Sequence, residues 1–324
     1  MTPARVAYRA PAWLPGAHLQ TIVGGRVLRP AAIAYRREEW ATPDRDRVAV
    51  DWVDGDPDAP LLALFHGLEG DSNSTYARSL MSAVRRRRLR GCVVHFRGCG
   101  GLPNLLPRAY HSGDADEIAW MVARLATHAG AAGLHTVGVS LGGNAMLKWL
   151  GGSGAAAGSL VRSAAAVCAP LDVGLCGDAL GQGFNLVYSR YFLSTLKPKA
   201  MAKLALSPGL FDPERMRRAT TLRHFDDCYT APVHGFRDAD DYWRQASSRP
   251  YLRSIAVPTL LINALNDPFV PIAALPGREE IGPGVSLERP AEGGHVGFVS
   301  GAFPGHTDWL PARVLDFFGL NRAQ

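Results

Sequence analysis

The feature that most constrains the fold is the pentapeptide Gly138–Gly142, which has the pattern G-x-S-x-G with Ser140 at its centre. Residues 134–137 before it are typical of a short buried strand, and residues 143–150 after it are typical of the start of a helix. This order predicts a nucleophile elbow, a tight turn that presents a serine between strand and helix. The turn strains the serine backbone, and the flanking glycines remove Cβ atoms that would clash. The alternative is a plain glycine-rich turn, because the chain contains 35 glycines.

Buried strands and amphipathic helices alternate on both sides of this turn. Continuous apolar runs are typical of parallel strands that are buried on both faces, whereas apolar residues at i, i+3, i+4 and i+7 indicate one face of a helix. The alternation predicts an α/β fold, with a mostly parallel central sheet, right-handed crossovers and helices on both faces. A hairpin of half-buried strands is expected before it, at residues 33–40 and 47–53. The apolar runs are residues 60–65, 92–96, 134–137, 164–168, 258–264 and 285–288.

The alternation stops between Leu171 and Pro250. Residues 171–250 show weak helical patterning, many arginines and tyrosines, and no clear buried strand. We therefore expect a single domain over residues 1–324, with residues 171–250 as a helical insertion that covers the carboxyl edge of the sheet as a lid.

The composition is that of an ordinary globular protein, with 324 residues of which 47% are hydrophobic and 20% charged. The first 16 residues lack the apolar core of a signal peptide, and no stretch approaches the ~18 uninterrupted apolar residues of a membrane span. These features predict a soluble, cytoplasmic protein. The five cysteines include no C-x-x-C pair, so neither a disulfide framework nor a zinc site is expected.

The formal net charge is +6, and arginine carries most of the positive charge. Arg85–Arg88 form a run of four that suits nucleic acid, anionic lipid or an acidic partner. The solvated end of an amphipathic helix explains the run better, because no nucleic-acid-binding module accompanies it. We expect no nucleic-acid partner, and a weak peripheral membrane contact stays open.

A serine hydroxyl attacks an ester only with a histidine as general base and a carboxylate that orients the histidine. In a doubly wound hydrolase the acid and then the histidine follow the serine along the chain. Asp267 directly follows the apolar run 258–264 and is the candidate acid, although Asp before Pro is also common in turns. His295, in a glycine-rich loop before the last helix, is the candidate base, and His306 is the second choice.

The oxyanion that forms during such an attack needs two backbone N–H donors. Leu141, directly after Ser140, is expected to supply one, and Leu68, in the loop after the run 60–65, the other. His66 in that loop is expected to order the loop. The sequence contains no H-E-x-x-H motif, no P-loop and no dinucleotide-binding glycine motif after a strand. We therefore expect no cofactor and no metal.

Seven short motifs are spread over nearly the whole chain: His18–Ile22, His66–Gly70, His95–Gly101, Tyr110–Gly113, Gly138–Asn144, His234–Phe236 and Asp267–Phe269. Together they resemble the α/β-hydrolase superfamily, and more narrowly its YheT-like branch, which includes eukaryotic lipid-acting abhydrolase proteins and yeast ester-forming acyltransferases. The resemblance implies a Ser–Asp–His hydrolase with carboxylic ester or lipid substrates. The family pattern maps onto Ser140, Asp267 and His295.

Residues and resemblance together predict a serine hydrolase that cleaves carboxylic esters, with short- to medium-chain acyl groups or lipids, through an acyl-enzyme. Its partner is then a small-molecule acyl ester. The alternative is an acyltransferase that uses the same three residues and passes the acyl group to an alcohol. A non-catalytic binding protein on the same fold is a third hypothesis. Its sequence signature, the loss of one of the three residues, is absent.

Overall fold

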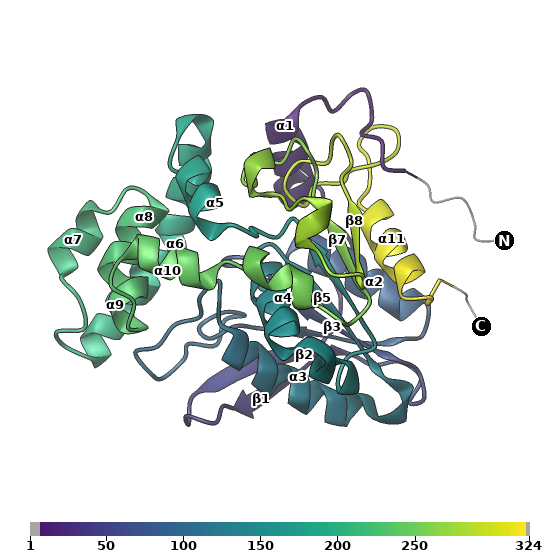
Figure 1. The fold of residues 1–324 in the computed structure, drawn as a ribbon, viewed down its shortest axis with the longest axis horizontal. Helices are drawn as coiled ribbons and strands as arrows, with labels where there is room; N and C mark the ends of the chain where they lie inside the picture. Colours follow the sequence, from purple (N-terminus) through teal and green to yellow (C-terminus); the bar gives the residue numbers. More distant parts are fainter. Residues whose placement is uncertain (1–6, 322–324) are drawn as a thin grey trace.

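The computed structural model describes residues 7–321 and contains a central sheet of eight strands (Figure 1). In chain order the strands are β1 (Arg36–Ala41), β2 (Arg47–Val53), β3 (Leu61–Phe65), β4 (Arg90–Val94), β5 (Leu134–Val139), β6 (Ser163–Val167), β7 (Thr259–Ile262) and β8 (Val285–Glu288). Their spatial order is β1-β2-β4-β3-β5-β6-β7-β8. Strand β2 is antiparallel to both β1 and β4, and the other pairs are parallel, as the alternation predicts. The chain reverses its direction of winding between β3 and β5, the place where ligands bind in open α/β sheets.

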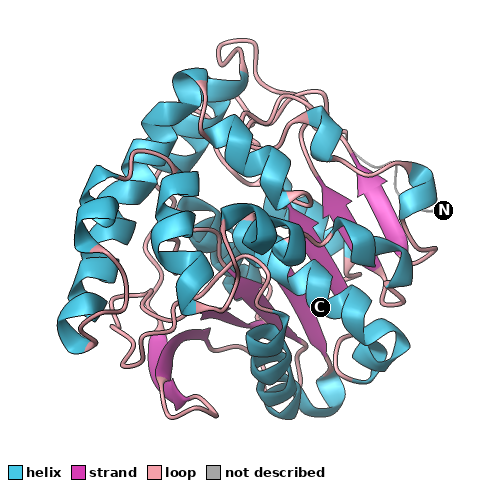
Figure 2. Ribbon diagram, turned by 60° about the vertical axis from the view of Figure 1, so that its left-hand side comes forward, coloured by secondary structure: helices cyan, strands magenta, loops and turns pink. Residues whose placement is uncertain are grey.

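Helices cover both faces of the sheet, which Figure 2 shows as a layer of strands between helices. The covering helices are α2 (Thr75–Arg86), α3 (Ala115–Ala129), α4 (Leu141–Ser153) and α11 (Trp309–Phe317). In β3, Leu61, Ala63 and Phe65 pack in one core with α3 and α4, whereas Leu62 and Leu64 pack in the other with α2 and α11. Alternate side chains of a strand point to opposite faces, so both sets must be apolar. No helix among residues 7–321 has the length and apolar character to span a membrane.

Between β6 and β7 the chain forms helices and no strand. We call residues 171–250, all of which the structure describes, the helical insertion. In Figure 1 it extends to the left of the sheet, in teal and green. Its α-helices are α5 (Val173–Leu180), α6 (Leu186–Leu206), α7 (Pro213–Arg218), α8 (Leu222–Phe225), α9 (Ala231–Val233) and α10 (Ala239–Ala246).

The expected hairpin is present as β1 and β2, but the half-buried character expected for β2 is wrong. Six of the seven β2 residues are buried, because the strand pairs on both sides and both of its faces are covered. The expectation of a half-exposed strand came from the charged residue Asp51 within the apolar alternation. Its carboxylate is instead buried, paired with Arg37 at 2.7 Å and accepting a hydrogen bond from Ser72 at 2.5 Å.

Candidate active site

Ser140 lies at the tip of the turn between β5 and α4, at the carboxyl edge of the sheet. Its backbone φ is 52°, in a region that non-glycine residues rarely adopt. The Ser140 N–H donates to the Val167 carbonyl oxygen at 2.8 Å, which ties the turn to β6. A Cβ on Gly138 would lie 2.6 Å from the backbone of α4, and a Cβ on Gly142 would lie 2.5 Å from the His66 carbonyl oxygen. Close packing therefore explains both glycines of the pentapeptide.

His295 and Asp267 form a hydrogen-bonded row with Ser140. The Nε2 atom of His295 lies 3.0 Å from the Ser140 Oγ, and its Nδ1 atom lies 2.8 Å from an oxygen of Asp267. The Asp267 side chain is fully buried, and it also accepts the N–H groups of Phe269 (2.8 Å) and Val270 (3.3 Å). Because an ionised carboxylate only accepts, the hydrogen of a neutral His295 ring belongs on Nδ1, and Nε2 is left to accept a proton.

The two expected oxyanion donors also lie at this edge. Among residues 7–321, the N–H groups of Leu68 and Leu141 donate to no acceptor. Both residues line the same cavity as Ser140. Leu141 is the first residue of α4, where the helix carries a partial positive charge. The loop with Leu68 runs close to the serine, since a Cβ on Gly67 would lie 3.1 Å from the Ser140 Cβ.

Two other histidines have different surroundings. His66 is fully buried, its Nε2 accepts the Phe96 N–H (3.0 Å), and its Nδ1 lies 2.7 Å from the Gly67 carbonyl oxygen. Burial lowers the pKa of His66 to about 3, so the neutral ring joins the loops after β3 and β4. His306, the second choice as base, has a half-exposed side chain and pairs with Asp308 rather than with Asp267.

A cavity of about 700 Å³ opens from Ser140 and His295 toward the helical insertion. Most of its wall is apolar, and α5 and α6 supply a large part of it. The wall residues on these two helices include Val173, Cys176, Leu180, Phe192, Leu196 and Ala200. Cavities of this size hold ligands as large as drug molecules.

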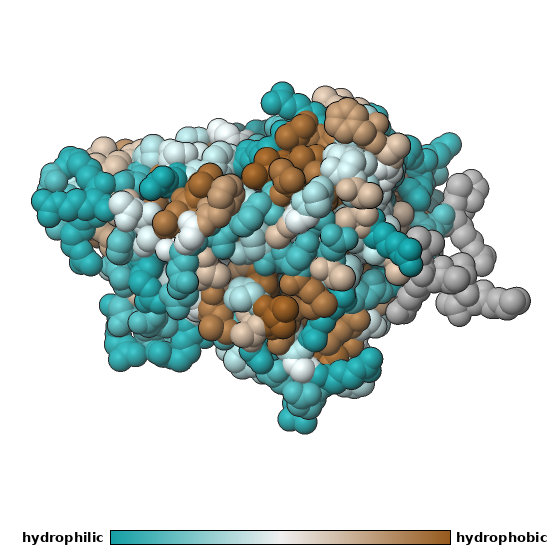
Figure 3. Space-filling model, turned by 90° about the horizontal axis from the view of Figure 1, so that it is seen from above, coloured by the Kyte–Doolittle hydropathy of each residue, from teal (hydrophilic) through white to brown (hydrophobic). Residues whose placement is uncertain are grey.

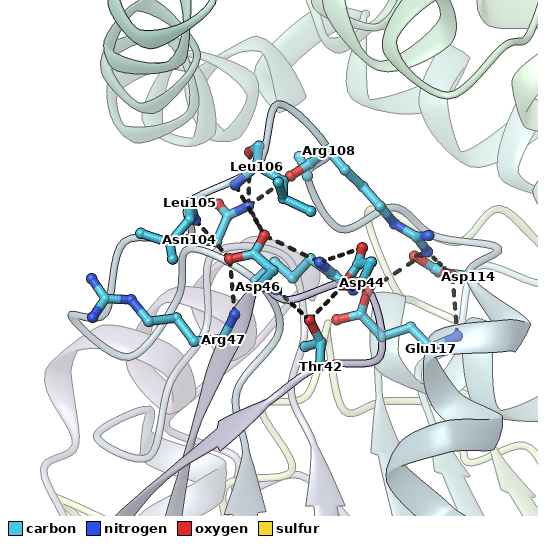
Figure 4. Close-up of polar contacts among 12 residues, drawn as sticks. Thr42, Asp44, Asp46, Arg47, Asn104, Leu105, Leu106, Arg108, Asp114 and Glu117 are labelled. Atoms are coloured by element: carbon cyan, nitrogen blue, oxygen red, sulfur yellow. Dashed lines mark hydrogen bonds and ion pairs between the residues drawn. The ribbon is translucent and has the colours of Figure 1, made fainter.

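A buried polar network fixes the loop that follows β4, which forms another part of the cavity wall (Figure 4). The Asp46 carboxylate is buried in the hairpin turn before β2. It accepts the N–H groups of Leu105 (2.6 Å) and Leu106 (3.2 Å) and the side-chain amide of Asn104 (2.8 Å). Arg97 pairs with the same carboxylate at 3.1 Å. The paired charges offset the cost of burying each one.

Lys203 of α6 attaches the helical insertion to this loop. Its Nζ donates to the Asn104 side-chain oxygen and to the Leu106 carbonyl oxygen, both at 2.6 Å. Burial lowers the pKa of Lys203 to about 8. The sequence pattern did not reveal this role, because a lysine on a helix is usually solvated.

Cys168, directly after β6, lies beside the site. Its Sγ accepts the Val296 N–H at 3.3 Å. Burial, and then the Asp267 carboxylate, raise the pKa of the Cys168 thiol well above its usual range, so the thiol stays protonated. Cys168, Asp267 and His295 are the one group of potential metal ligands found in residues 7–321. The group does not suit a metal, because His295 and Asp267 already bond to each other and the thiol carries its proton.

Comparisons with known proteins agree with this arrangement. A profile of the family described as alpha/beta hydrolase fold matches residues 60–302. The chain belongs to the α/β-hydrolase family. Within it, the chain is 39% identical to YheT of Escherichia coli (strain K12) over 93% of this chain and 89% of that protein, so it belongs to the YheT-like branch. It is 28% identical to phospholipase ABHD3 of Mus musculus, over 92% of this chain and 74% of that protein.

Solved α/β-hydrolase structures show the same fold at low sequence identity. The Pyrococcus furiosus esterase Pf2001 is 16% identical and superposes with a TM-score of 0.56, over 88% of this chain and 92% of that chain. The expected α/β-hydrolase fold, with its mostly parallel sheet and helices on both faces, is therefore confirmed.

Proposed function

We propose that the protein is a carboxylesterase-type serine hydrolase with Ser140, Asp267 and His295 as its catalytic triad. The observation that carries the proposal is the hydrogen-bonded row from the Ser140 Oγ through His295 to the buried Asp267, at 3.0 and 2.8 Å. Such a row is what a serine needs to become a nucleophile at neutral pH. Membership in the α/β-hydrolase family supports the same class of reaction.

In the proposed reaction the Ser140 Oγ attacks the ester carbonyl carbon while His295 Nε2 takes the hydroxyl proton. The carbonyl oxygen becomes an oxyanion and accepts hydrogen bonds from the N–H groups of Leu68 and Leu141. When the tetrahedral intermediate collapses, the bond to the alcohol breaks and His295 returns the proton to the leaving alcohol. A water molecule, deprotonated by His295, then attacks the acyl-enzyme. The bond between the acyl carbon and the Ser140 Oγ breaks, His295 returns the proton to that oxygen, and the carboxylic acid leaves. Asp267 stays ionised throughout and stabilises the imidazolium.

The substrate class we propose is an ester with an apolar acyl group of short to medium length, or a lipid ester. The cavity of about 700 Å³ with its mostly apolar wall supports this choice. The name phospholipase of the mouse relative supports a lipid ester. The helical insertion supplies α5 and α6 to the wall, and we propose that it acts as the lid that selects the acyl group.

Hydrolysis of p-nitrophenyl esters, from butyrate to dodecanoate, tests the proposal. Wild type is expected to turn over these esters, and Ser140→Ala is expected to lose at least about 10⁴-fold in kcat. A fluorophosphonate probe is expected to label wild type and not the variant. Equal rates in both proteins would sink the proposal, and an unlabelled Ser140 would favour a non-catalytic binding protein. Formation of ethyl esters after addition of ethanol would favour the acyltransferase instead.

The weak membrane contact that the sequence leaves open has a candidate surface in the structure. Leu19 of α1 (Ala17–Ile22), Phe184 in the short turn before α6, and Val187 in the first turn of α6 are about half exposed, at 50%, 53% and 50%. Figure 3 looks onto the end of the molecule with α1 and α5 and shows apolar side chains gathered in groups there. The Arg26 guanidinium lies 3.9 Å from the centre of the Tyr191 ring beside them. Sedimentation with anionic liposomes at low salt measures the contact. A protein that stays in the supernatant would contradict it.

A further inference from the structure

One buried side chain of α1 (Ala17–Ile22) joins the two loops that carry the acid and the base. Gln20 is fully buried. Its Oε1 accepts the Gly293 N–H and the Asn266 side-chain amide, each at 2.9 Å. Gly293 belongs to the loop of His295, and Asn266 directly precedes Asp267. A single oxygen atom therefore links the backbone of one loop to a side chain of the other.

The amide nitrogen of Gln20 holds this oxygen in place. Its Nε2 donates to the Leu14 carbonyl oxygen at 3.0 Å and to the Glu292 carboxylate at 3.3 Å. The four contacts use both hydrogens and both lone pairs of the amide. Rotation of the side chain would leave several buried polar groups unpaired, which is unfavourable. Gln20 is therefore held in one orientation.

The next residue of α1 holds the histidine itself. The Thr21 Oγ1 accepts the His295 N–H at 2.9 Å and donates to the Ala17 carbonyl oxygen at 2.8 Å. A second link between the two loops lies beside it, since the Asn266 side-chain oxygen accepts the Gly294 N–H at 2.9 Å. The backbone of His295 is thus attached to α1, while its ring points to Ser140.

Helix α1 packs tightly against the loop at residues 293–297, which carries His295, so neither can shift toward the other. A Cβ on Gly297 would lie 2.4 Å from the Gln20 carbonyl oxygen, and a Cβ on Gly294 would lie 2.7 Å from the Thr21 Oγ1. The two backbones are therefore in direct contact. Neither Gln20 nor Thr21 lines the cavity that opens from Ser140.

We propose that Gln20 and Thr21 are positioning residues that hold His295 and Asp267 in reach of Ser140, an inference that rests on the proposed function. They act through the two loops and not on the substrate. A displacement of about 1 Å at a catalytic group costs on the order of 100-fold in rate. The His18–Ile22 motif thereby acquires a role that the sequence alone did not suggest.

Substitutions at Thr21 test the proposal with little change in volume. Thr21→Val removes the acceptor for the His295 N–H, and we expect kcat to fall about 10-fold or more with KM nearly unchanged. Thr21→Ser keeps the hydroxyl and is expected to restore kcat. Thr127→Val is the matched control, because the Thr127 hydroxyl makes the same bond to a carbonyl oxygen four residues earlier, on the exposed face of α3. Unchanged kcat in Thr21→Val, or equal loss in Thr21→Ser, would overturn the proposal.

Gln20→Glu supplies a pH-dependent readout. The new carboxylate keeps the acceptor for Gly293 but repels Glu292 and the Leu14 carbonyl oxygen, whereas its protonated form donates one hydrogen again. The kcat of Gln20→Glu relative to wild type is therefore expected to rise as the pH falls. A ratio that is flat with pH, or that follows the unfolded fraction at each pH, would count against positioning.

Hydrogen–deuterium exchange at residues 293–297 separates this proposal from the proposed function. Faster exchange is expected in Thr21→Val than in wild type and Thr127→Val, whether or not the protein turns over esters. If wild type lacks Ser140-dependent activity but exchange responds, the hydrolase proposal fails and the attachment of the loop to α1 stands. If wild type is active and exchange does not respond, the positioning role is wrong.

Discussion

The Nε2 atom of His295 lies 3.0 Å from the Oγ atom of Ser140, although 155 residues separate the two along the chain. Ser140 follows β5 and His295 follows β8, two parallel strands of one sheet. The carboxyl ends of parallel strands meet at one edge, so residues in the loops after them come together. Asp267 follows β7 and joins them for the same reason.

Asp267→Asn is expected to lower kcat by roughly 10³- to 10⁴-fold, because an amide that donates to His295 Nδ1 favours the wrong tautomer. The protein should remain folded, since the side chain keeps its size. Asp308→Asn is the matched control, because Asp308 pairs with the half-exposed His306. Its activity should equal that of wild type. Comparable kcat in Asp267→Asn and wild type would exclude Asp267 as the acid of the triad.

Gly142→Ala and Gly152→Ala, both in α4, are expected to change stability in opposite directions. A Cβ at Gly142 would lie 2.5 Å from the carbonyl oxygens of Phe65 and His66, so overpacking should cost about 1–3 kcal/mol. A Cβ at Gly152 meets no atom within 4 Å, and alanine favours the helix by about 0.5–1 kcal/mol. Urea denaturation measures both. Equal stability of the two variants would contradict the packing of α4 against β3.

Leu196→Trp should shift the acyl-chain preference toward shorter esters. Leu196 lines the cavity from α6, and a larger ring there reduces the space for the acyl chain. The ratio of kcat/KM for p-nitrophenyl dodecanoate to that for the butyrate ester is expected to fall about 10-fold or more. Val187→Trp, on the same helix but outside the cavity, is the control. An unchanged ratio in Leu196→Trp means that the acyl chain does not lie along α6.

Lys203→Met is expected to alter how stability depends on pH. The pKa of Lys203 is lowered by burial from 10.5 to about 8 in the folded protein. Between these two values the unfolded chain binds more protons, so wild type gains stability relative to Lys203→Met as the pH rises above about 8. Below that pH both states carry the charge and the difference is constant. Urea unfolding of both proteins from about pH 7 to about pH 10 measures the difference in their free energies of unfolding. A difference that stays constant across this range would contradict the lowered pKa of Lys203.

The parts of the fold that could be predicted from the sequence depend on local patterns. The continuous apolar run of β3 and the G-x-S-x-G turn are such patterns, because burial on both faces and a strained turn each restrict the residues that fit. Burial of Asp51 could not be predicted, because it depends on Arg37 and Ser72, which lie elsewhere in the chain. A charged residue in a strand alternation indicates an exposed face unless such a partner is known.

Ser140, Asp267 and His295 were all proposed as site residues from their order after strands. In the structure His295 lies within hydrogen-bonding distance of both Ser140 and Asp267. No comparable sequence pattern indicates which residues lie around these three. Gln20 meets Gly293 across 273 positions, and no period or motif spacing links residues so far apart. Cys168 likewise lies beside Val296 because β6 ends next to the histidine loop, a result of sheet order rather than of sequence pattern.

The contact between α1 and the loop at residues 293–297 has a consequence for synthesis. Gln20 of α1 is translated 273 residues before Gly293 of its partner loop. A nascent or prematurely terminated chain therefore presents the serine turn without the histidine loop docked beside it. Such incomplete chains should have no activity on the lipids and esters around them. Activity should appear in a single step, when the loop at residues 293–297 has docked against α1.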